Sequence, residues 1–294
     1  MIGKMENNRT KGIVCILLSA FGFAVMAFMI RLCDDFGPKI SCFQKSFFRN
    51  FIAFIIALFA VMRDKELNNV DLMPPDVSRM KVWKALLCRS AFGTIGVFCN
   101  FYALSIIPIG EGMTLNKTAP FFTVLFSWLL LGERMKARQF VMLIVAFLGA
   151  ALVMKPGFRP SDSFAAGLAL LGGLGAGLAY VSVHYLGRLK VRSSLIVVFF
   201  SAFSCLASLP FIFLDFQMMT ASQVLIMLAC GGGAAMGQFG VTAAYRYAEP
   251  RSIAIFDYSN VLFTSIFGLL FFSQVPDALS VIGFIVIILA AAVR

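Results

Sequence analysis

The sequence predicts an all-α polytopic membrane protein whose ten transmembrane helices form two inverted five-helix repeats. Of its 294 residues, 60% are hydrophobic and 13% are charged, and the mean hydropathy is +0.91. A soluble domain of this length needs more charged residues to cover its surface, so lipid must be the solvent around most side chains. The apolar residues also fall into stretches of bilayer-spanning length, and part of the sequence repeats itself.

A helix that crosses a bilayer needs about 20 apolar residues, and ten such stretches follow one another between polar breaks. They cover residues 11–32, 40–62, 82–104, 109–131, 137–154, 164–187, 193–213, 222–245, 251–272 and 278–293. Residues 1–10 are expected to form a cytoplasmic N-terminal segment, and the two repeats to span 11–155 and 156–294. The first stretch lacks a small-residue cleavage signature, so we expect a transmembrane helix rather than a signal peptide.

The Lys and Arg residues between these stretches are unevenly distributed. The termini and the loops on their side hold roughly four times as many as the loops on the other side. Because cytoplasmic loops carry the basic excess, both termini are predicted in the cytoplasm, in a multi-pass protein of the plasma (cytoplasmic) membrane. The formal charge of +11 therefore reflects topology, and no nucleic-acid partner is expected because the basic residues form no continuous stripe.

The internal repeat is weak but regular. A shift of 141 positions lays Ala103–Glu133 over Ala244–Gln274, and both stretches begin at a helix end and pass a proline in the turn. Five helices are an odd number, so the second repeat must enter the membrane from the opposite face. Many secondary transporters have this architecture, because the two halves supply interchangeable outward-open and inward-open arrangements.

The sequence gives little indication of a disulfide, metal, nucleotide-binding or catalytic site. The seven cysteines have no paired spacing, so neither a disulfide framework nor a zinc site is predicted. His184 is the single histidine, which excludes a multi-histidine metal centre, and no nucleotide-binding or hydrolase motif is present. We therefore expect no metal, no cofactor and no catalytic residues. A membrane-embedded enzyme or a scaffold is the remote alternative, since only His184 could serve as a base.

Ionisable side chains at membrane depth carry the functional prediction, because they are expensive there and usually face the bundle interior. The set consists of Lys45, Arg49, Arg89, Lys117, Glu111, Asp257 and His184. The four Lys and Arg residues outnumber the two carboxylates, so a negatively charged group of a ligand is their natural partner. Arg would hold it with forked hydrogen bonds and Lys with a point charge.

The repeat overlay places part of this set at one centre. It sets Asn116 on Asp257 and Lys117 on Tyr258, so these four residues are expected to approach the same region from opposite helices. The same overlay fits a structural ion pair or a gate between Lys117 and Asp257 equally well.

Each remaining candidate also has a structural interpretation. Lys45 is close enough to the outer interface to reach water, and Arg89 can snorkel or pair with a helix end. Glu111 and His184 join Asp257 as candidates for ion coupling, although capping of a helix N-terminus suits Glu111 and an interfacial position suits His184. Pro120 is a candidate hinge that should weaken its helix and expose carbonyl groups.

Five short motifs resemble those of a known family. They are Phe48-Arg49, Leu87-Cys88-Arg89-Ser90, Phe101-Tyr102-Ala103-Leu104, Thr118-Ala119-Pro120-Phe121 and Leu131-Gly132-Glu133. With these residues the chain resembles the drug/metabolite transporter superfamily, specifically its EamA-type carriers of ten helices in five-plus-five repeats. The resemblance covers nearly the whole chain and departs at Ser273-Gln274, where a Gly-Glu pair is usual. It implies a metabolite carrier with a central cavity between the halves.

These observations predict a secondary, non-ATP transporter that moves a small anionic or zwitterionic organic metabolite across the bilayer by alternating access. Arg49, Arg89 and Lys117 would neutralise the negative group of this substrate. The alternative is an exporter of neutral or cationic compounds, in which Glu111 and Asp257 act and the basic residues are paired internally. A homodimer is left open.

Overall fold

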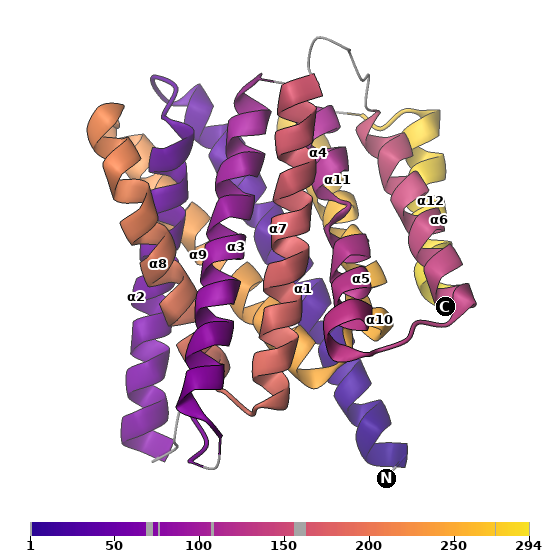
Figure 1. The fold of residues 1–294 in the computed structure, drawn as a ribbon. Helices are drawn as coiled ribbons and strands as arrows, with labels where there is room; N and C mark the ends of the chain where they lie inside the picture. The colour runs from indigo at the N-terminus through magenta and orange to yellow at the C-terminus, as the bar shows by residue number, and fades with distance from the viewer. Residues whose placement is uncertain are drawn as a thin grey trace.

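The computed structural model describes residues 2–68, 73–75, 77–106, 109–155, 163–273 and 275–293. All regular secondary structure in these ranges is helical. The long helices lie side by side as a bundle, and both chain ends lie at the lower ends of their helices in Figure 1. Termini on one side of a bundle require an even number of crossings, as the sequence predicts.

The first half contains α1 (Ile2–Asp35), α2 (Cys42–Asn68), α3 (Arg79–Ile106), α4 (Ile109–Asn116), α5 (Ala119–Leu131) and α6 (Ala137–Met154). The second half contains α7 (Ser163–Arg188), α8 (Ser193–Leu214), α9 (Ala221–Tyr247), α10 (Pro250–Ile253), the 3-10 helix η2 (Ala254–Tyr258), α11 (Ser259–Phe272) and α12 (Ala278–Val293). Eight spans are long and apolar enough to cross a bilayer, and Ala278–Ala292 is a shorter apolar helix. With the α4–α5 pair they account for the ten predicted stretches.

The first helix is longer than predicted. α1 begins at Ile2, so the residues that the sequence set apart as an N-terminal segment continue the helix. Their polar character marks the end of the apolar stretch, but it does not stop a helix, because Lys, Glu and Arg are good helix formers.

The fourth crossing is broken in its middle. The interruption separates α4 from α5, which has Pro120 in its first turn. Pro120 has no N–H to donate to the carbonyl one turn back, so a regular α-helix cannot run through this point. The Thr118 N–H donates to the Leu115 carbonyl at 3.2 Å, and the Thr118 hydroxyl donates to the same oxygen at 2.6 Å. The break therefore lies beside Lys117.

The ninth crossing is interrupted at the equivalent place, although the sequence predicted one continuous helix over 251–272. The 3-10 helix η2 separates α10 from α11 and contains Asp257 and Tyr258, which the repeat overlay sets on the break in the first half. Pro250 lies at the start of α10, well before this point. The interruption thus has no local proline as its cause, and the helix type changes where η2 packs against α1 and α6.

The turn after each broken crossing also repeats. Gly132 ends α5 with a φ of 72°, and Ser273 ends α11 with a φ of 52°. This left-handed backbone favours glycine, but serine adopts it here. At Ser273 the side chain therefore differs from that of the family motif, but the left-handed backbone conformation is the same. Gln274 lies outside the described residues.

Helix packing follows a pseudo-two-fold pattern. α1 packs along α9 and α3 along α7, which are equivalent pairs when the halves are exchanged, and α2 packs on α8 and α6 on α12. α1 starts at the lower end of the bundle and α7 at the upper end, so the halves run in opposite directions (Figure 1). This is the packing of two inverted repeats. Their predicted boundary falls next to residues 156–162, which lie outside the described ranges, and it stays a prediction.

Glycines allow the two largest helix contacts. A Cβ on Gly96 of α3 would lie 3.0 Å from the Gly172 carbonyl oxygen of α7, and a Cβ on Gly22 of α1 would lie 2.6 Å from the Gly237 nitrogen of α9. These neighbours are backbone atoms, so any larger residue would force the helices apart. Gly96 and Gly237 are also equivalent under the shift of 141 positions. The same close-packed crossing therefore occurs twice between the halves, at positions that the repeat relates.

Large apolar side chains cover the outside of the bundle. Phe59, Phe213 and Leu214 are 65%, 84% and 85% exposed, and many other large apolar side chains are exposed with them. Such a surface is stable only where lipid covers it. The chain is a multi-pass integral membrane protein.

Replacing Gly22 by Ala should destabilise the protein by about 1–3 kcal/mol, because the added methyl group collides with the α9 backbone. Gly232→Ala in α9 is the matched control, since a Cβ there meets no atom within 4 Å. The control should be neutral or stabilising by up to about 1 kcal/mol. Thermal unfolding of the purified full-length protein in detergent measures both variants, and equal melting temperatures would contradict the packing argument.

Candidate functional site

Two arginines are buried in the bundle without a carboxylate. Arg49 on α2 is 5% exposed, and Arg89 on α3 is 2% exposed. Burying a guanidinium is costly unless an opposite charge and hydrogen-bond acceptors compensate it. Among the residues that the structure describes, no acidic side chain pairs with either group, and both Nε atoms are buried without a hydrogen-bond partner.

Arg89 is held by neutral groups from α8 and α9. Its Nη2 donates to Oε1 of Gln238 on α9 at 2.9 Å, and its guanidinium carbon lies 3.9 Å from the centre of the Phe200 ring on α8. Gly93, one turn further along α3, leaves the space that this pose needs, because a Cβ there would collide with Nη1 of Arg89 and with Phe200. The amide and the ring fix the position of the guanidinium while leaving its charge uncompensated.

Arg49 is held more loosely. Its guanidinium carbon lies 5.6 Å from the centre of the Phe101 ring, and no hydrogen bond from its side chain is present within the described ranges. The charges of Arg49 and Arg89 are close enough to interact, and both interact with Tyr180 of α7. Tyr180 in turn stacks on Tyr245 at 5.2 Å between ring centres. Arg49 and Arg89 therefore lie within electrostatic reach of each other and of Tyr180.

An ion pair joins the two helix breaks. Lys117 Nζ lies 3.2 Å from Oδ2 of Asp257, and both side chains are almost enclosed, with 12% and 13% exposure. The Tyr258 hydroxyl donates to the Lys117 carbonyl at 3.0 Å, a carbonyl that the broken helix leaves accessible. Asn116 ends α4, where its side-chain nitrogen lies beside Gly172 of α7. The structure thus brings the residues of the repeat overlay into one region.

Other predicted site residues lie elsewhere. Lys45 forms an ion pair with Asp34 at 2.5 Å, where α1 ends and α2 begins, so its charge is matched near one end of the bundle. Pro120 is buried in the first turn of α5. The side chain of Glu111 lies outside the described residues, so its predicted capping or coupling role stays a prediction.

His184 belongs to a hydrogen-bond network near one end of the bundle. Its Nδ1 lies 2.7 Å from the Tyr245 carbonyl oxygen, and its Nε2 lies 2.8 Å from Oε1 of Glu133. Burial alone would raise the pKa of Glu133, but hydrogen bonds from His184 and Ser127 and the charges of His184 and Arg188 outweigh it, so the pKa lies below its ordinary value. Glu133 of the first half is thereby tied to α7 and α9 of the second.

A second set of contacts joins the halves at the opposite end. The Gln44 side chain donates to the Gln217 carbonyl at 2.8 Å and accepts from the Gln217 N–H at 3.0 Å. The Gln223 side chain donates to the carbonyls of Cys33 and Pro38 at 3.1 and 2.9 Å. Both ends of the bundle are therefore bridged between halves in this conformation.

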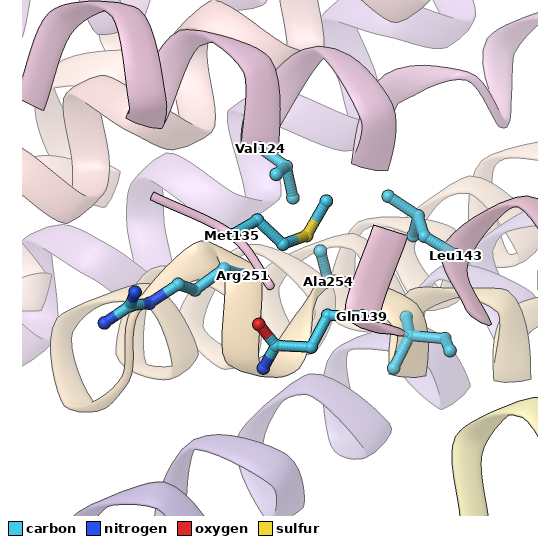
Figure 2. A pocket seen from close by; sticks show the side chains of 7 residues that line it. Val124, Met135, Gln139, Leu143, Arg251 and Ala254 are labelled. Atoms are coloured by element: carbon cyan, nitrogen blue, oxygen red, sulfur yellow. The ribbon is translucent and has the colours of Figure 1, made fainter. Parts of the chain in front are cut away.

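A small pocket lies away from the arginines. It contains about 210 Å³ of empty space, part of it open to solvent. Its lining is Val124, Met135, Gln139, Leu143, Arg251, Ala254 and Ile255. Figure 2 shows the Arg251 guanidinium at the edge of this group, and it is bound to Glu249 and to the Arg134 carbonyl. The pocket has no uncompensated charge, so it is a weaker ligand site than the arginine pair.

Sequence reasoning missed the groups that hold the arginines. Phe200 and Phe101 are two of 33 phenylalanines, and Gly93 is one of 24 glycines, so composition and spacing do not single them out. Gln238 is an exception, because the sequence offers it with Tyr180, Tyr102 and Asn100 as a possible polar contact to a cavity, although nothing in the sequence ranks these four residues. Only the packing of α8 and α9 against α3 shows their role. Within the described ranges, no three His, Cys, Asp or Glu side chains come together as a metal site requires.

Removing one partner of the enclosed ion pair should be costly. Asp257→Asn leaves Lys117 without its counter-charge, and we expect a loss of about 3–5 kcal/mol of stability. The double variant Asp257→Asn with Lys117→Gln should recover most of this loss, because no unpaired charge remains. Melting temperatures of the two single variants and the double variant measure the coupling, and strictly additive effects would show that the two side chains do not interact.

The Glu133 network predicts a pH dependence. Because folding lowers the pKa of Glu133, its ionised form stabilises the protein above its ordinary pKa of about 4.3, and this contribution is lost as the pH falls through the lowered value. Glu133→Gln should therefore cost about 1–3 kcal/mol near pH 7 and progressively less in acid. Glu249→Gln, in the exposed pair with Arg251, is the control and should cost at most about 1 kcal/mol. A Glu133→Gln deficit that stays constant down to the acid limit would contradict this assignment.

Comparison with known proteins agrees with this architecture. A chain in a solved crystal structure has the same fold, with a TM-score of 0.77, 18% identity, and coverage of 94% of this chain and 96% of the other. The S-adenosylmethionine uptake transporter of Rickettsia prowazekii is 23% identical over 86% of this chain and 82% of its own. The riboflavin transporter of Vibrio cholerae is 28% identical over 70% of this chain and 69% of its own.

A further relative matches almost end to end. The pseudopaline exporter of Pseudomonas aeruginosa is 30% identical over 280 residues, which are 95% of this chain and 94% of the exporter. The model of the EamA-like transporter family matches residues 10–155, which contain the first repeat with its Leu131-Gly132-Glu133 turn. These relatives are transporters of small metabolites and none is named as an enzyme. The chain belongs to the EamA-like transporter family.

Proposed function

We propose that this protein is a secondary carrier that moves a small anionic or zwitterionic organic metabolite across the plasma membrane, with both termini in the cytoplasm. The observation that carries the proposal is the pair of buried guanidinium groups of Arg49 and Arg89, which lack an acidic partner among the described residues. A negatively charged substrate supplies the missing charge and the missing hydrogen-bond acceptors.

The Lys117–Asp257 pair extends this site. Its two charges are balanced in the present conformation, and they belong to the two helix breaks that lie at equivalent places in the repeats. Opening the pair frees an ammonium group for a substrate anion and a carboxylate for a substrate amine or a proton. Lys117 thus joins Arg49 and Arg89 as a substrate contact in the conformations in which the pair is open.

Alternating access is supported by the inverted packing and by the contacts at the two ends of the bundle. Glu133 and His184 join the halves at one end, and Gln44 and Gln217 join them at the other. An outward-open or inward-open state requires one of these contacts to break while the other holds. Both are formed here, as expected of a conformation between the two open states. The names of the relatives favour an organic metabolite as cargo and leave its identity for measurement.

Arg49→Gln and Arg89→Gln should each abolish substrate transport, because either change removes a charge from the binding region. Counterflow into proteoliposomes measures this, with labelled pseudopaline, riboflavin and S-adenosylmethionine as the first probes. Arg63→Gln, an exposed position near the end of the same helix as Arg49, is the control and should transport like the unaltered protein. Full transport by both arginine variants, with any probe that the unaltered protein carries, would refute the proposal.

A further inference from the structure

The buried charges around the tyrosine pair do not cancel. Lys117 and Asp257 neutralise each other across 3.2 Å. Arg49 and Arg89 are both more enclosed than this pair, and no described carboxylate contacts either of them. Arginine stays protonated in proteins, so among the residues that the structure describes the region carries two positive charges without a counter-charge. In a low-dielectric interior such a surplus must be matched by the ligand.

We infer that the part of the substrate held between Arg49 and Arg89 carries two negative charges, either as two carboxylates or as one doubly charged group such as a phosphate. This inference rests on the proposed function and adds the charge of the ligand to it. A ligand with a single carboxylate would leave the charge of one guanidinium uncompensated. A zwitterion with one carboxylate would also add the positive charge of its own ammonium group to the site.

The geometry of the two guanidinium groups favours this charge. Arg89 donates one N–H to Gln238 and lies over the Phe200 ring, so these two contacts fix the direction of its remaining donors. Arg49, on the neighbouring helix, has no hydrogen bond from its guanidinium within the described ranges. The two groups are close enough to repel each other, and neither has another cation-neutralising neighbour in the described part of the chain. An anion of double charge between them would remove this repulsion as well as the desolvation cost.

Gln238 provides a direct way to change the charge of the site. Its Oε1 already accepts a hydrogen bond from Arg89 at 2.9 Å. Gln238→Glu keeps the size of the side chain and its hydrogen-bond acceptor but adds one negative charge. The new carboxylate would neutralise one of the two guanidinium charges, which in the unaltered protein the ligand neutralises. The variant should therefore lose its preference for doubly charged ligands. Arg89→Gln also lowers the net charge of the site by one, because it removes a positive charge. It should therefore also lose the preference for doubly charged ligands.

The test is ligand-induced thermal stabilisation of the full-length protein in detergent at pH 8 and constant ionic strength. Succinate and inorganic phosphate are the doubly charged probes, and acetate and glycine are the matched probes of lower charge. Succinate or phosphate should stabilise the unaltered protein at concentrations about tenfold lower than acetate or glycine, which is the effect of one additional charge-assisted hydrogen bond. Stabilisation by succinate alone indicates two carboxylates, and stabilisation by phosphate alone indicates one doubly charged group.

In Gln238→Glu and in Arg89→Gln the tenfold preference should disappear. Equal stabilisation of the unaltered protein by acetate and succinate, no stabilisation by either doubly charged probe, or an unchanged preference in both variants would overturn the inference. If Gln238→Glu does not fold, Arg89→Gln alone decides. If this test fails while Arg49→Gln and Arg89→Gln still lose transport, the proposed function stands and the inferred ligand charge is wrong. Full transport by both arginine variants would refute both.

Discussion

The cost of holding charge inside a lipid-solvated bundle governs how this protein is built. Most of its ionisable side chains lie at the helix ends, where water and headgroups solvate them. The few that lie deeper have one of two kinds of partner. Lys117 has an aspartate, whereas Arg49 and Arg89 have, within the described part of the chain, only aromatic rings and an amide. In the proposed carrier a bound anion would complete a pair of this second kind, which would otherwise only lower stability.

The helix breaks and the glycine contacts serve this arrangement. An unbroken helix satisfies its own backbone groups and offers a ligand only side chains, while a break beside Lys117 and another at Asp257 and Tyr258 expose polar backbone at membrane depth. Close contact at Gly22 and Gly96 brings the long helices together. Because the helix breaks occur once in each half and the glycine contacts are related by the repeat, the two repeats present similar surfaces to the same central region.

The two ends of the bundle differ in chemistry although they are related by the repeat. One is closed by an ionic network around Glu133 and His184, and the other by amide hydrogen bonds of Gln44, Gln217 and Gln223. An ionic contact responds to pH and to salt, whereas amide contacts respond to neither in the same range. In the proposed transport cycle, the step that opens the Glu133 end would therefore depend on pH and salt more than the step that opens the Gln44 end.

The sequence by itself determined the membrane setting, the ten crossings and the inverted repeat, because hydropathy and the Lys and Arg distribution depend on composition along the chain. It also indicated the break at Pro120, since proline acts on its own helix. Only the tertiary structure decided that Lys117 meets Asp257, that Lys45 is matched by Asp34, and that Phe200, Gly93 and Gln238 hold Arg89. Those facts depend on which helices pack together, and the partner of a buried charge is chosen by that packing rather than by its neighbours in sequence.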